Sequence, residues 1–465
     1  MPNPLAPAWL TEPQDPNALA PSVWSRNSRR NDAGELEIAG IRATELVERF
    51  GTPVYVVDEA DARARAAEIH AAFTGEFGRV GTTASVYYAG KAFLCTEVAR
   101  WMTAAGLNID VASGGELAVA LAAGVDPARL GFHGNNKSHG EIDRAVRVGI
   151  GTIILDSESE IGVVAEAAAR HGVRQRVRLR VNSGVHASTH EFLATAREDQ
   201  KFGIPLADVP ELVTRIRATD SLDFMGLHSH IGSQIFDTAG FVEAARRLFR
   251  VTAELLEGGP VPELNLGGGF GIAYTSADDA PDVRDIARSM ADIVATEAAA
   301  LGVPLPHIAV EPGRSIIGPS TTTLYTVGTI KPVLVSEVDG DPAERIYVSV
   351  DGGMSDNIRT ALYGADYSAR IVSRSSDADP ALVRVAGKHC ESGDIVVDAE
   401  YLPRDVHSGD VLGVPATGAY CWSLASNYNY LTRPPVVAVS DGEARLIVRG
   451  ETEDDLLARD MGVQR

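Results

Sequence analysis

The chain has 465 residues, of which 45% are hydrophobic and 23% charged, and its formal net charge at neutral pH is −21. This length exceeds what one ordinary hydrophobic core serves, so we expect two domains. The acidic balance argues against a nucleic-acid-binding protein, which would carry a basic stripe. No run of about 18 apolar residues occurs, so no membrane span is expected.

The cysteines are three in number, Cys95, Cys390 and Cys421, and no CxxC pair occurs. This pattern supports neither a disulfide framework nor a cysteine zinc site, and it predicts a reducing, cytoplasmic compartment. The N-terminal stretch Met1–Ser22 is rich in proline and polar residues. It lacks the basic and apolar regions of a signal peptide, so none is expected.

The central part of the chain alternates short β-branched runs with segments of helical periodicity. Eight such repeats over about 250 residues predict a TIM-like (β/α)8 barrel with a parallel sheet. One strand candidate is in excess, and we assign the first to the other domain. The strand candidates are Val54–Val57, Ser85–Ala89, Asn108–Val111, Leu130–His133, Thr152–Leu155, Arg176–Val181, Phe224–His228, Glu263–Leu266 and His307–Val310. The helix candidates are Asp61–Phe73, Gly114–Ala123, Glu158–His171 and Phe241–Leu256, and the candidate helix caps are Ser113, Ser138 and Ser157.

After Glu311 the pattern changes to short strands separated by turn residues, beginning with "TTTLYTVGTIKPVLV". This pattern of short strands and turns predicts an antiparallel β domain, either a Greek-key barrel or a sandwich. We therefore expect an α/β protein in three parts. These are an N-terminal arm over residues 1–35, a barrel over 58–315, and a β domain made of 36–57 and 316–465.

Polar residues follow the predicted barrel strands, at the end where active sites of such barrels lie. Lys91 in "YYAGKAF" is either a surface lysine or one that forms a Schiff base. The glycines of "LNLGGGFG" make either a tight turn or an anion cradle. Glu311 is either a helix cap or the partner of a ring nitrogen. His228 and His230, at strand spacing, favour a core or stacking role over zinc, because no third ligand has suitable spacing.

A single cofactor would explain why these residues occur together. Pyridoxal 5′-phosphate needs an amine for its aldehyde, backbone donors for its phosphate, an acid for its pyridine nitrogen and a ring on its face. Lys91, Gly267–Gly269, Glu311 and His230 supply these four, each from a strand end on one barrel face. No metal is expected.

These residues resemble the fold-type III pyridoxal-phosphate decarboxylases, and most closely the diaminopimelate decarboxylase family. The resemblance covers about residues 45 to 450. Its motifs are "YYAGKAF", "DVASGGEL", "HGNNKS", "GLHSHIGSQ", "LNLGGGFG", "EPGRS", "DGGMSDNIRTALYGA", "CESGD" and "GAYCWSLASNYN".

The resemblance implies a role for each matching position. Lys91 is implied to bind the aldehyde, His230 to stack on the ring and Glu311 to face the pyridine nitrogen. Cys390 is implied to be the proton donor, whereas its surroundings alone favour a small core residue. The other implied cofactor contacts are Ser233, Gly268, Gly269, Pro312, Gly313, Arg314 and Tyr420. The implied substrate ligands are Arg314, Arg359, Tyr363, Glu391 and Tyr420.

The resemblance also implies an alanine-racemase-like barrel in a homodimer, with "CESGD" of one subunit completing the Lys91 site of the other. It implies a small-molecule substrate, meso-2,6-diaminopimelate, which loses carbon dioxide to give L-lysine. Ser188 stands where close relatives are expected to have histidine.

Three other functions compete with this one. A decarboxylase of ornithine or arginine would not need the arginine and tyrosine of "DNIRTALY" for a second carboxylate. A racemase would place arginine rather than Glu311 at the ring nitrogen. A non-catalytic cofactor carrier would have no use for "CESGD".

Overall fold

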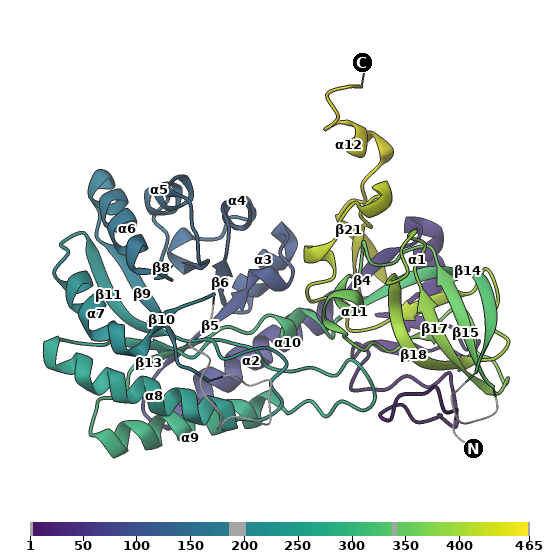
Figure 1. Ribbon diagram of the computed structural model, residues 1–465, viewed down its shortest axis with the longest axis horizontal. Helices are drawn as coiled ribbons and strands as arrows, with labels where there is room; N and C mark the ends of the chain where they lie inside the picture. The colour runs from purple at the N-terminus through teal and green to yellow at the C-terminus, as the bar shows by residue number, and fades with distance from the viewer. Residues whose placement is uncertain (1–2, 186–200, 337–341, 464–465) are drawn as a thin grey trace. The chain divides into compact units, whose positions relative to one another are not determined.

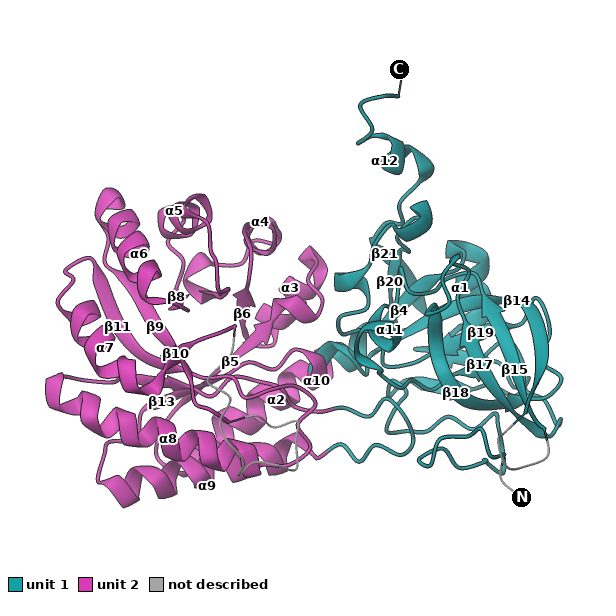
Figure 2. Ribbon diagram, in the orientation of Figure 1, with its two compact units in different colours: residues 1–62, 272–280, 316–465 teal, residues 63–271, 281–315 magenta. Residues whose placement is uncertain are grey.

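The computed structural model describes residues 3–185, 201–336 and 342–463, so Ser188 lies outside the described residues. The chain divides into two compact units (Figure 2). Unit 1 comprises residues 1–62, 272–280 and 316–465, and unit 2 comprises residues 63–271 and 281–315. The expected arm, residues 1–35, thus falls within unit 1. Residues 272–280 leave the predicted barrel sequence to join unit 1, a detour that no sequence pattern marks.

Unit 2 is a closed barrel of parallel strands with helices outside them (Figure 1). Its strand order is β5-β6-β7-β8-β9-β11-β12-β13, and pairing of β13 with β5 and of β8 with β9 closes the ring. This confirms the predicted barrel and its strand positions. The strands are β5 (Ala84–Ala89), β6 (Asn108–Val111), β7 (Leu130–Phe132), β8 (Thr152–Leu155), β9 (Gln175–Asn182), β11 (Leu222–His228), β12 (Glu263–Asn265) and β13 (His307–Val310); β10 (Ile204–Pro205) pairs outside with β9.

The barrel helices begin largely where the sequence placed caps. Ser113 accepts a hydrogen bond from the Glu116 backbone, and Ser138 forms a full capping box with Glu141. Ser157 lies at the predicted N-cap position, but its hydroxyl accepts no backbone hydrogen bond from the helix start and contacts the Ser159 hydroxyl instead. Its expected partner Glu160 turns inward to Lys137. The helices are α2 (Glu59–Arg79), α3 (Thr96–Ala104), α4 (Gly114–Ala122), α5 (His139–Arg147), α6 (Glu158–His171), α7 (Val209–Arg217), α8 (Ala239–Leu255), α9 (Val283–Leu301) and α10 (Arg314–Ile317).

Unit 1 is built on a strongly curved sheet in the order β18-β17-β15-β14-β4-β20-β21, with β19 also on β14 and β16 on β19. The surplus strand β4 lies here, as predicted. Most pairs are antiparallel, but β15–β17 and β4–β20 are parallel, which the sequence did not predict. The strands are β4 (Val54–Asp58), β14 (Thr321–Val335), β15 (Ala343–Val350), β16 (Arg370–Ile371), β17 (Pro380–Ala386), β18 (Ile395–Pro403), β19 (Val411–Val414), β20 (Val436–Ser440) and β21 (Glu443–Val448). Smaller elements are β1 (Ser28–Arg30), β2 (Leu36–Ile38), β3 (Ile41–Arg42), α1 (Ala43–Phe50), α11 (Arg359–Tyr363) and α12 (Glu453–Leu457).

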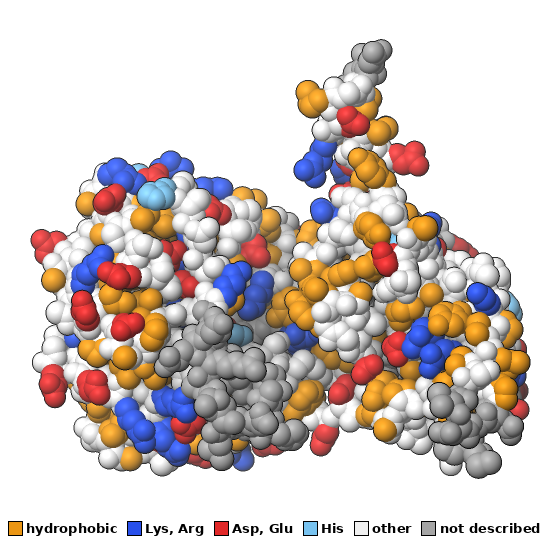
Figure 3. All heavy atoms as spheres, viewed as in Figure 1, with side chains coloured by type: hydrophobic (Ala, Val, Ile, Leu, Met, Phe, Trp, Pro, Cys, Tyr) orange, Lys and Arg blue, Asp and Glu red, His pale blue; other side chains and the backbone are white. Residues whose placement is uncertain are grey.

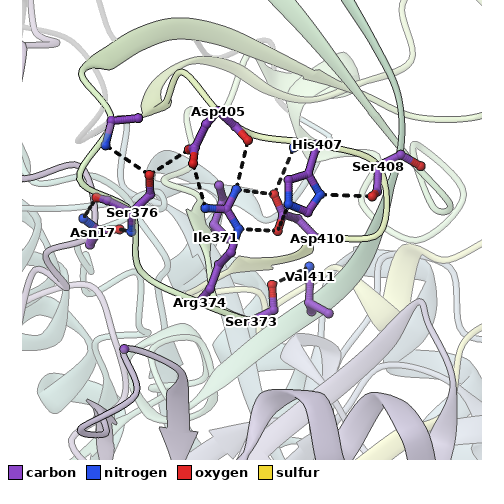
Figure 4. Close-up of polar contacts among 12 residues, drawn as sticks. Asn17, Ile371, Ser373, Arg374, Ser376, Asp405, His407, Ser408, Asp410 and Val411 are labelled. Atoms are coloured by element: carbon purple, nitrogen blue, oxygen red, sulfur yellow. Dashed lines mark hydrogen bonds and ion pairs between the residues drawn. The ribbon is translucent and has the colours of Figure 1, made fainter.

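The N-terminal arm packs against the β domain rather than lying loose. Leu5, Ala6 and Leu10 contact a buried cluster on β17 and β18. Further along, the Asn17 amide exchanges two hydrogen bonds with the Ser376 backbone, of 2.8 and 3.0 Å (Figure 4). Ser376 in turn donates to Asp405. The arm is therefore held by apolar contacts and by a polar network.

On the face drawn in Figure 3, basic and acidic side chains are interspersed over each unit and form no basic stripe. Within the described ranges, no helix is both long and apolar enough to cross a membrane.

Candidate active site

Polar side chains gather at the carboxyl ends of the barrel strands, the end where parallel barrels place their sites. Asp110 lies in β6, His133 follows β7, His228 ends β11, and Asn265 ends β12. Glu311 directly follows β13. The closed ring of parallel strands brings the carboxyl ends of all strands to one end of the barrel. Side chains from different strands therefore meet there.

Glu311 is the centre of this group. The Asn265 amide donates to its Oε1 at 2.6 Å, and His228 Nε2 lies 3.2 Å from its Oε2. Burial alone would raise the pKa of Glu311, but the adjacent imidazoles of His228 and His133 hold that pKa well below its usual range. Glu311 is therefore an ionised carboxylate in a largely buried position.

His133 lies between two carboxyl groups. Its Nε2 is 3.2 Å from Asp110 Oδ1 and 3.4 Å from Glu311 Oε1. Burial and the nearby charge of Glu311 raise the pKa of Asp110 well above its usual value. Burial also lowers the pKa of His133 and of His228 to about 4. At neutral pH both imidazoles are therefore neutral beside the carboxylate of Glu311.

The sequence analysis argued against a zinc site because no third ligand has suitable spacing from His228 and His230. It did not anticipate that His133 and Glu311 lie close to His228. His133 and Glu311 bring ligand atoms within 4.8 Å of one another and of His228. However, both oxygens of Glu311 already have hydrogen-bond donors, Asn265 and His228. This arrangement favours an acid that faces a ring nitrogen.

The glycine triplet lies beside Glu311 and permits very close backbone approach. A Cβ on Gly268 would lie 2.1 Å from the Glu311 carbonyl oxygen, and one on Gly269 would lie 2.2 Å from that of Gly232. Gly269 also has a φ of +101°, which side chains disfavour. The Gly268 N–H donates to His230 Nδ1 at 3.3 Å. His230 therefore faces the glycine loop, whereas His228 faces Glu311.

The segment after β13 and the segment after β5 pack together. The Ala89 N–H donates to the Pro312 carbonyl at 3.0 Å, and Gly313 packs closely against Ala89. Arg314 Nη2 donates to the Ser233 hydroxyl at 2.8 Å. Lys91 lies in the turn that follows β5 and is exposed. Burial, with the charge of Lys91 second, lowers the pKa of His230 to about 3, so this ring is also neutral.

Two further groups of predicted residues lie in unit 1. Arg359 is buried, only 5% exposed, so a surface ion-pairing role is excluded. It donates to the Tyr367 hydroxyl at 2.5 Å, and its guanidinium lies 4.8 Å from the Tyr274 ring centroid and 6.0 Å from that of Tyr420. Tyr363, on the same short helix, is 66% exposed, so the two do not share a buried face.

The second group is the loop with Cys390 and Glu391, which are both exposed. Beneath them His389 and Asp394 are buried and joined by a 3.0 Å contact between Nδ1 and Oδ2. Cys390 is therefore not a core residue, whereas Cys95 and Cys421 are buried.

Comparisons with known proteins agree with this geometry. The family model of the pyridoxal-dependent decarboxylases, pyridoxal binding domain, matches residues 63–318. The diaminopimelate decarboxylase of Mycobacterium tuberculosis (strain ATCC 25618 / H37Rv) is 52% identical, over 95% of this chain and 98% of its own. That of Bacillus subtilis (strain 168) is 43% identical, over 93% and 97%.

The chain belongs to the pyridoxal-dependent decarboxylase family. A solved diaminopimelate decarboxylase from M. jannaschii, in co-complex with L-lysine, is 31% identical and superimposes with a TM-score of 0.86 over 94% of this chain and 98% of its own. The predicted family, enzyme class and cofactor are thereby confirmed.

The barrel residues fit the cofactor of this decarboxylase family. The glycine loop lies at the same barrel end, packed against the backbone of Glu311 and Gly232, and Arg314, whose guanidinium donates to Ser233, supplies a positive charge for a phosphate there. The buried anion of Glu311 suits a protonated ring nitrogen. Neutral His230 can lie against a ring without repelling its charge. Lys91, at the same barrel end, could supply the amine.

Sequence reasoning missed several residues of the decarboxylase site. Asp110 and His133 lie within predicted barrel strands, but nothing in the sequence indicated that His133 would lie between Asp110 and Glu311. Asn265, Tyr274 and Tyr367 were not singled out at all. The only sequence signal for Asn265 is its position at the end of a barrel strand. A polar amide buried there needs a hydrogen-bond partner, and this could have pointed to a nearby polar side chain.

Proposed function

We propose that this decarboxylase converts meso-2,6-diaminopimelate to L-lysine and carbon dioxide, the last step of lysine biosynthesis from diaminopimelate. The observation that carries the proposal is the ionised, buried Glu311 at the barrel end that holds Lys91 and the glycine loop. An anion beside the ring nitrogen keeps that nitrogen protonated, which makes the ring a strong electron sink. A racemase needs a weaker electron sink, so Glu311 speaks against racemase activity. The names of the close relatives support the substrate.

When bound, pyridoxal 5′-phosphate supplies an aldehyde for the substrate's amine and a ring that withdraws electrons from the breaking carbon–carbon bond. Lys91 binds this aldehyde in the resting enzyme. Glu311 holds a proton on the ring nitrogen, and Asn265 and His228 keep Glu311 oriented. His230 would lie against the ring face, and Gly268, Gly269 and Ser233 would contact the phosphate. Pro312, Gly313 and Arg314 would be further cofactor contacts, with Arg314 hydrogen-bonded to Ser233.

The other end of the substrate carries a second carboxylate and a second ammonium group. Arg359 supplies a planar donor for that carboxylate, held in place by Tyr367. The exposed carboxylate of Glu391 suits the ammonium, and Tyr363 and Tyr420 complete the pocket. Substrates of the ornithine or arginine type lack the carboxylate, so they leave Arg359 without a partner.

Cys390 acts as the proton donor in this proposal. After carbon dioxide has left, Cys390 Sγ gives its proton to the same carbon, and the electron pair of the broken bond forms the new carbon–hydrogen bond. The thiolate then regains a proton from solvent. An exposed thiol with this role needs a reducing compartment, which supports a location in the cytoplasm.

The sites are shared in a homodimer, with Cys390 of one subunit serving Lys91 of the other. Unit 1 supports this with exposed apolar side chains near the expected substrate ligands, namely Leu362 at 55%, Tyr363 at 66% and Leu424 at 40%. Mixing inactive Lys91→Ala and Cys390→Ala subunits tests it. Mixed dimers should regain one working site in two, and a site within one chain would give no recovery.

The substrate assignment is tested by a panel of amino acids offered to the purified holoenzyme. Carbon dioxide should be released from meso-diaminopimelate, with negligible kcat/KM for ornithine, arginine and lysine. Comparable release from any of those three would contradict the assignment.

A further inference from the structure

The turn formed by residues 427–431 lies against the loop that carries Cys390 and Glu391. The backbone N–H of Cys390 donates to Asn429 Oδ1 at 3.0 Å. The Tyr428 hydroxyl donates to Glu391 Oε2 at 3.3 Å. Two neighbouring side chains of the turn thus contact two neighbouring residues of the loop, one through its backbone and the other through its carboxylate.

The backbone of this turn is unusual. Asn429 has φ 52° and ψ 24°, and the next residue, Tyr430, has a φ of +58°. Left-handed conformations are uncommon outside glycine and persist where surrounding contacts enforce them. Asparagine is among the side chains that tolerate this conformation best. The strained geometry directs the Asn429 amide oxygen to the Cys390 backbone.

The turn is anchored at both ends, so it is a fixed support. Asn427 Nδ2 donates to the Leu431 carbonyl at 3.0 Å and to Glu451 Oε2 at 2.5 Å. The Ser426 N–H donates to the Ser355 carbonyl at 2.9 Å. These contacts hold the segment from both sides while Tyr428 and Asn429 remain exposed.

The loop itself has a rigid base. Asp394 accepts from the His389 backbone at 2.8 Å and from the Met354 backbone at 2.6 Å. The Tyr428 ring stacks on the buried His389 ring, with centroids 5.5 Å apart and planes within 6°. Cys390 and Glu391 are among the exposed residues of this loop, and Tyr428 and Asn429 of the turn contact them.

We infer that Tyr428 and Asn429 are positioning residues of the decarboxylation reaction, Tyr428 orienting the Glu391 carboxylate for the substrate's ammonium and Asn429 fixing the Cys390 backbone for proton return. This inference rests on the proposed roles of Glu391 and Cys390. The two contacts serve different steps, so removing each changes a different kinetic constant. Loss of the Tyr428 hydroxyl weakens substrate binding. Loss of the Asn429 oxygen slows the chemical step, because a misplaced donor reacts more slowly.

The test is steady-state kinetics of holoenzyme variants with meso-diaminopimelate. Tyr428→Phe keeps the ring on His389 and should raise KM by about fivefold with kcat unchanged. Asn429→Gly tolerates the left-handed backbone but lacks the oxygen, and should lower kcat by about fivefold with KM and bound cofactor unchanged. Asn429→Asp keeps a side-chain oxygen that can accept from Cys390 and also tolerates the left-handed backbone, so its kcat should be close to that of the wild type. Tyr430→Phe is the matched control and should behave as wild type.

Variants of the supported residues separate this inference from the proposed function. Glu391→Gln and Cys390→Ala should impair turnover on their own. If they do, and Tyr428→Phe and Asn429→Gly keep wild-type constants, the positioning roles are wrong. If Tyr428→Phe and Asn429→Gly lower kcat and raise KM alike, or Asn429→Asp fails to restore kcat, the contacts are merely structural and the inference is also overturned. If Glu391→Gln and Cys390→Ala are both fully active, the proposed roles fail and this inference fails with them.

Discussion

Asn265 donates a 2.6 Å hydrogen bond to Glu311 from the neighbouring strand end of the barrel. This bond occupies one carboxylate oxygen with a donor that cannot lose its proton, and His228 contacts the other oxygen. The pair therefore fixes both the orientation and the charge of the acid. A carboxylate fixed in this way is prepared for a cationic ring nitrogen before the cofactor arrives.

Glu311→Gln should retain bound cofactor yet lose roughly 10²-fold or more in kcat, because the amide cannot stabilise a protonated ring nitrogen. Cofactor content is measured by absorbance and turnover by carbon dioxide release. An unchanged kcat would show that Glu311 is not the acid of the ring nitrogen.

Stability of the cofactor-free enzyme should fall as pH falls from 6.5 towards 4. Burial lowers the pKa of His133 and His228 from 6.5 to about 4, so in this window the unfolded chain binds protons that the folded chain does not. Each imidazole contributes up to about 1.4 kcal/mol per pH unit to the slope. His133→Asn should make the slope shallower in urea unfolding measured between pH 4.5 and 7. His171→Asn, at a partly exposed position, serves as control, and an equal change in both variants would contradict the account.

Tyr367→Phe removes the hydroxyl that accepts from Arg359, leaving the ring in place. The guanidinium should become less ordered, and KM for diaminopimelate should rise by roughly tenfold while cofactor binding is spared. Tyr347, whose hydroxyl accepts from Arg384 at 3.4 Å, is a similar arginine–tyrosine pair for comparison. If Tyr347→Phe raised KM as much as Tyr367→Phe, the effect would not report on substrate binding.

Gly269→Ala should release the cofactor. The added Cβ would lie 2.2 Å from the Gly232 carbonyl oxygen at a φ of +101°, so the loop must shift. Equilibrium dialysis of pyridoxal 5′-phosphate against the variant measures the loss of affinity. Gly162→Ala, in helix α6 with open space around it, is the matched control. Equal cofactor affinity in both variants would show that the glycine loop is not part of the cofactor site.

The sequence predicted the barrel well because strand periodicity, cap residues and turn glycines are local properties. The strand Val54–Val57 could be assigned to the other domain by counting alone, and β4 confirms this. The capping box expected at Ser157 is incomplete, because the Glu160 carboxylate binds the buried Lys137 and the Ser157 hydroxyl contacts Ser159, and these contacts depend on tertiary structure. The parallel pairing of β15 with β17 could not be predicted in this way, because the two strands are joined by a long connection rather than by a hairpin turn.

The candidate site was predictable only where one residue type is chemically necessary. An amine, an acid and a glycine loop have recognisable places at strand ends, so Lys91, Glu311 and Gly269 could be named. Residues that act through others have no such signature. His133 contacts Glu311 across the barrel, and Tyr274 meets Arg359 only because residues 272–280 join unit 1.

The most direct measurement is a mass balance on purified holoenzyme given meso-2,6-diaminopimelate as its only substrate. The account predicts that carbon dioxide and L-lysine form in equal amounts, and that Lys91→Ala abolishes both. Loss of diaminopimelate without carbon dioxide, or formation of a stereoisomer in place of lysine, would contradict it.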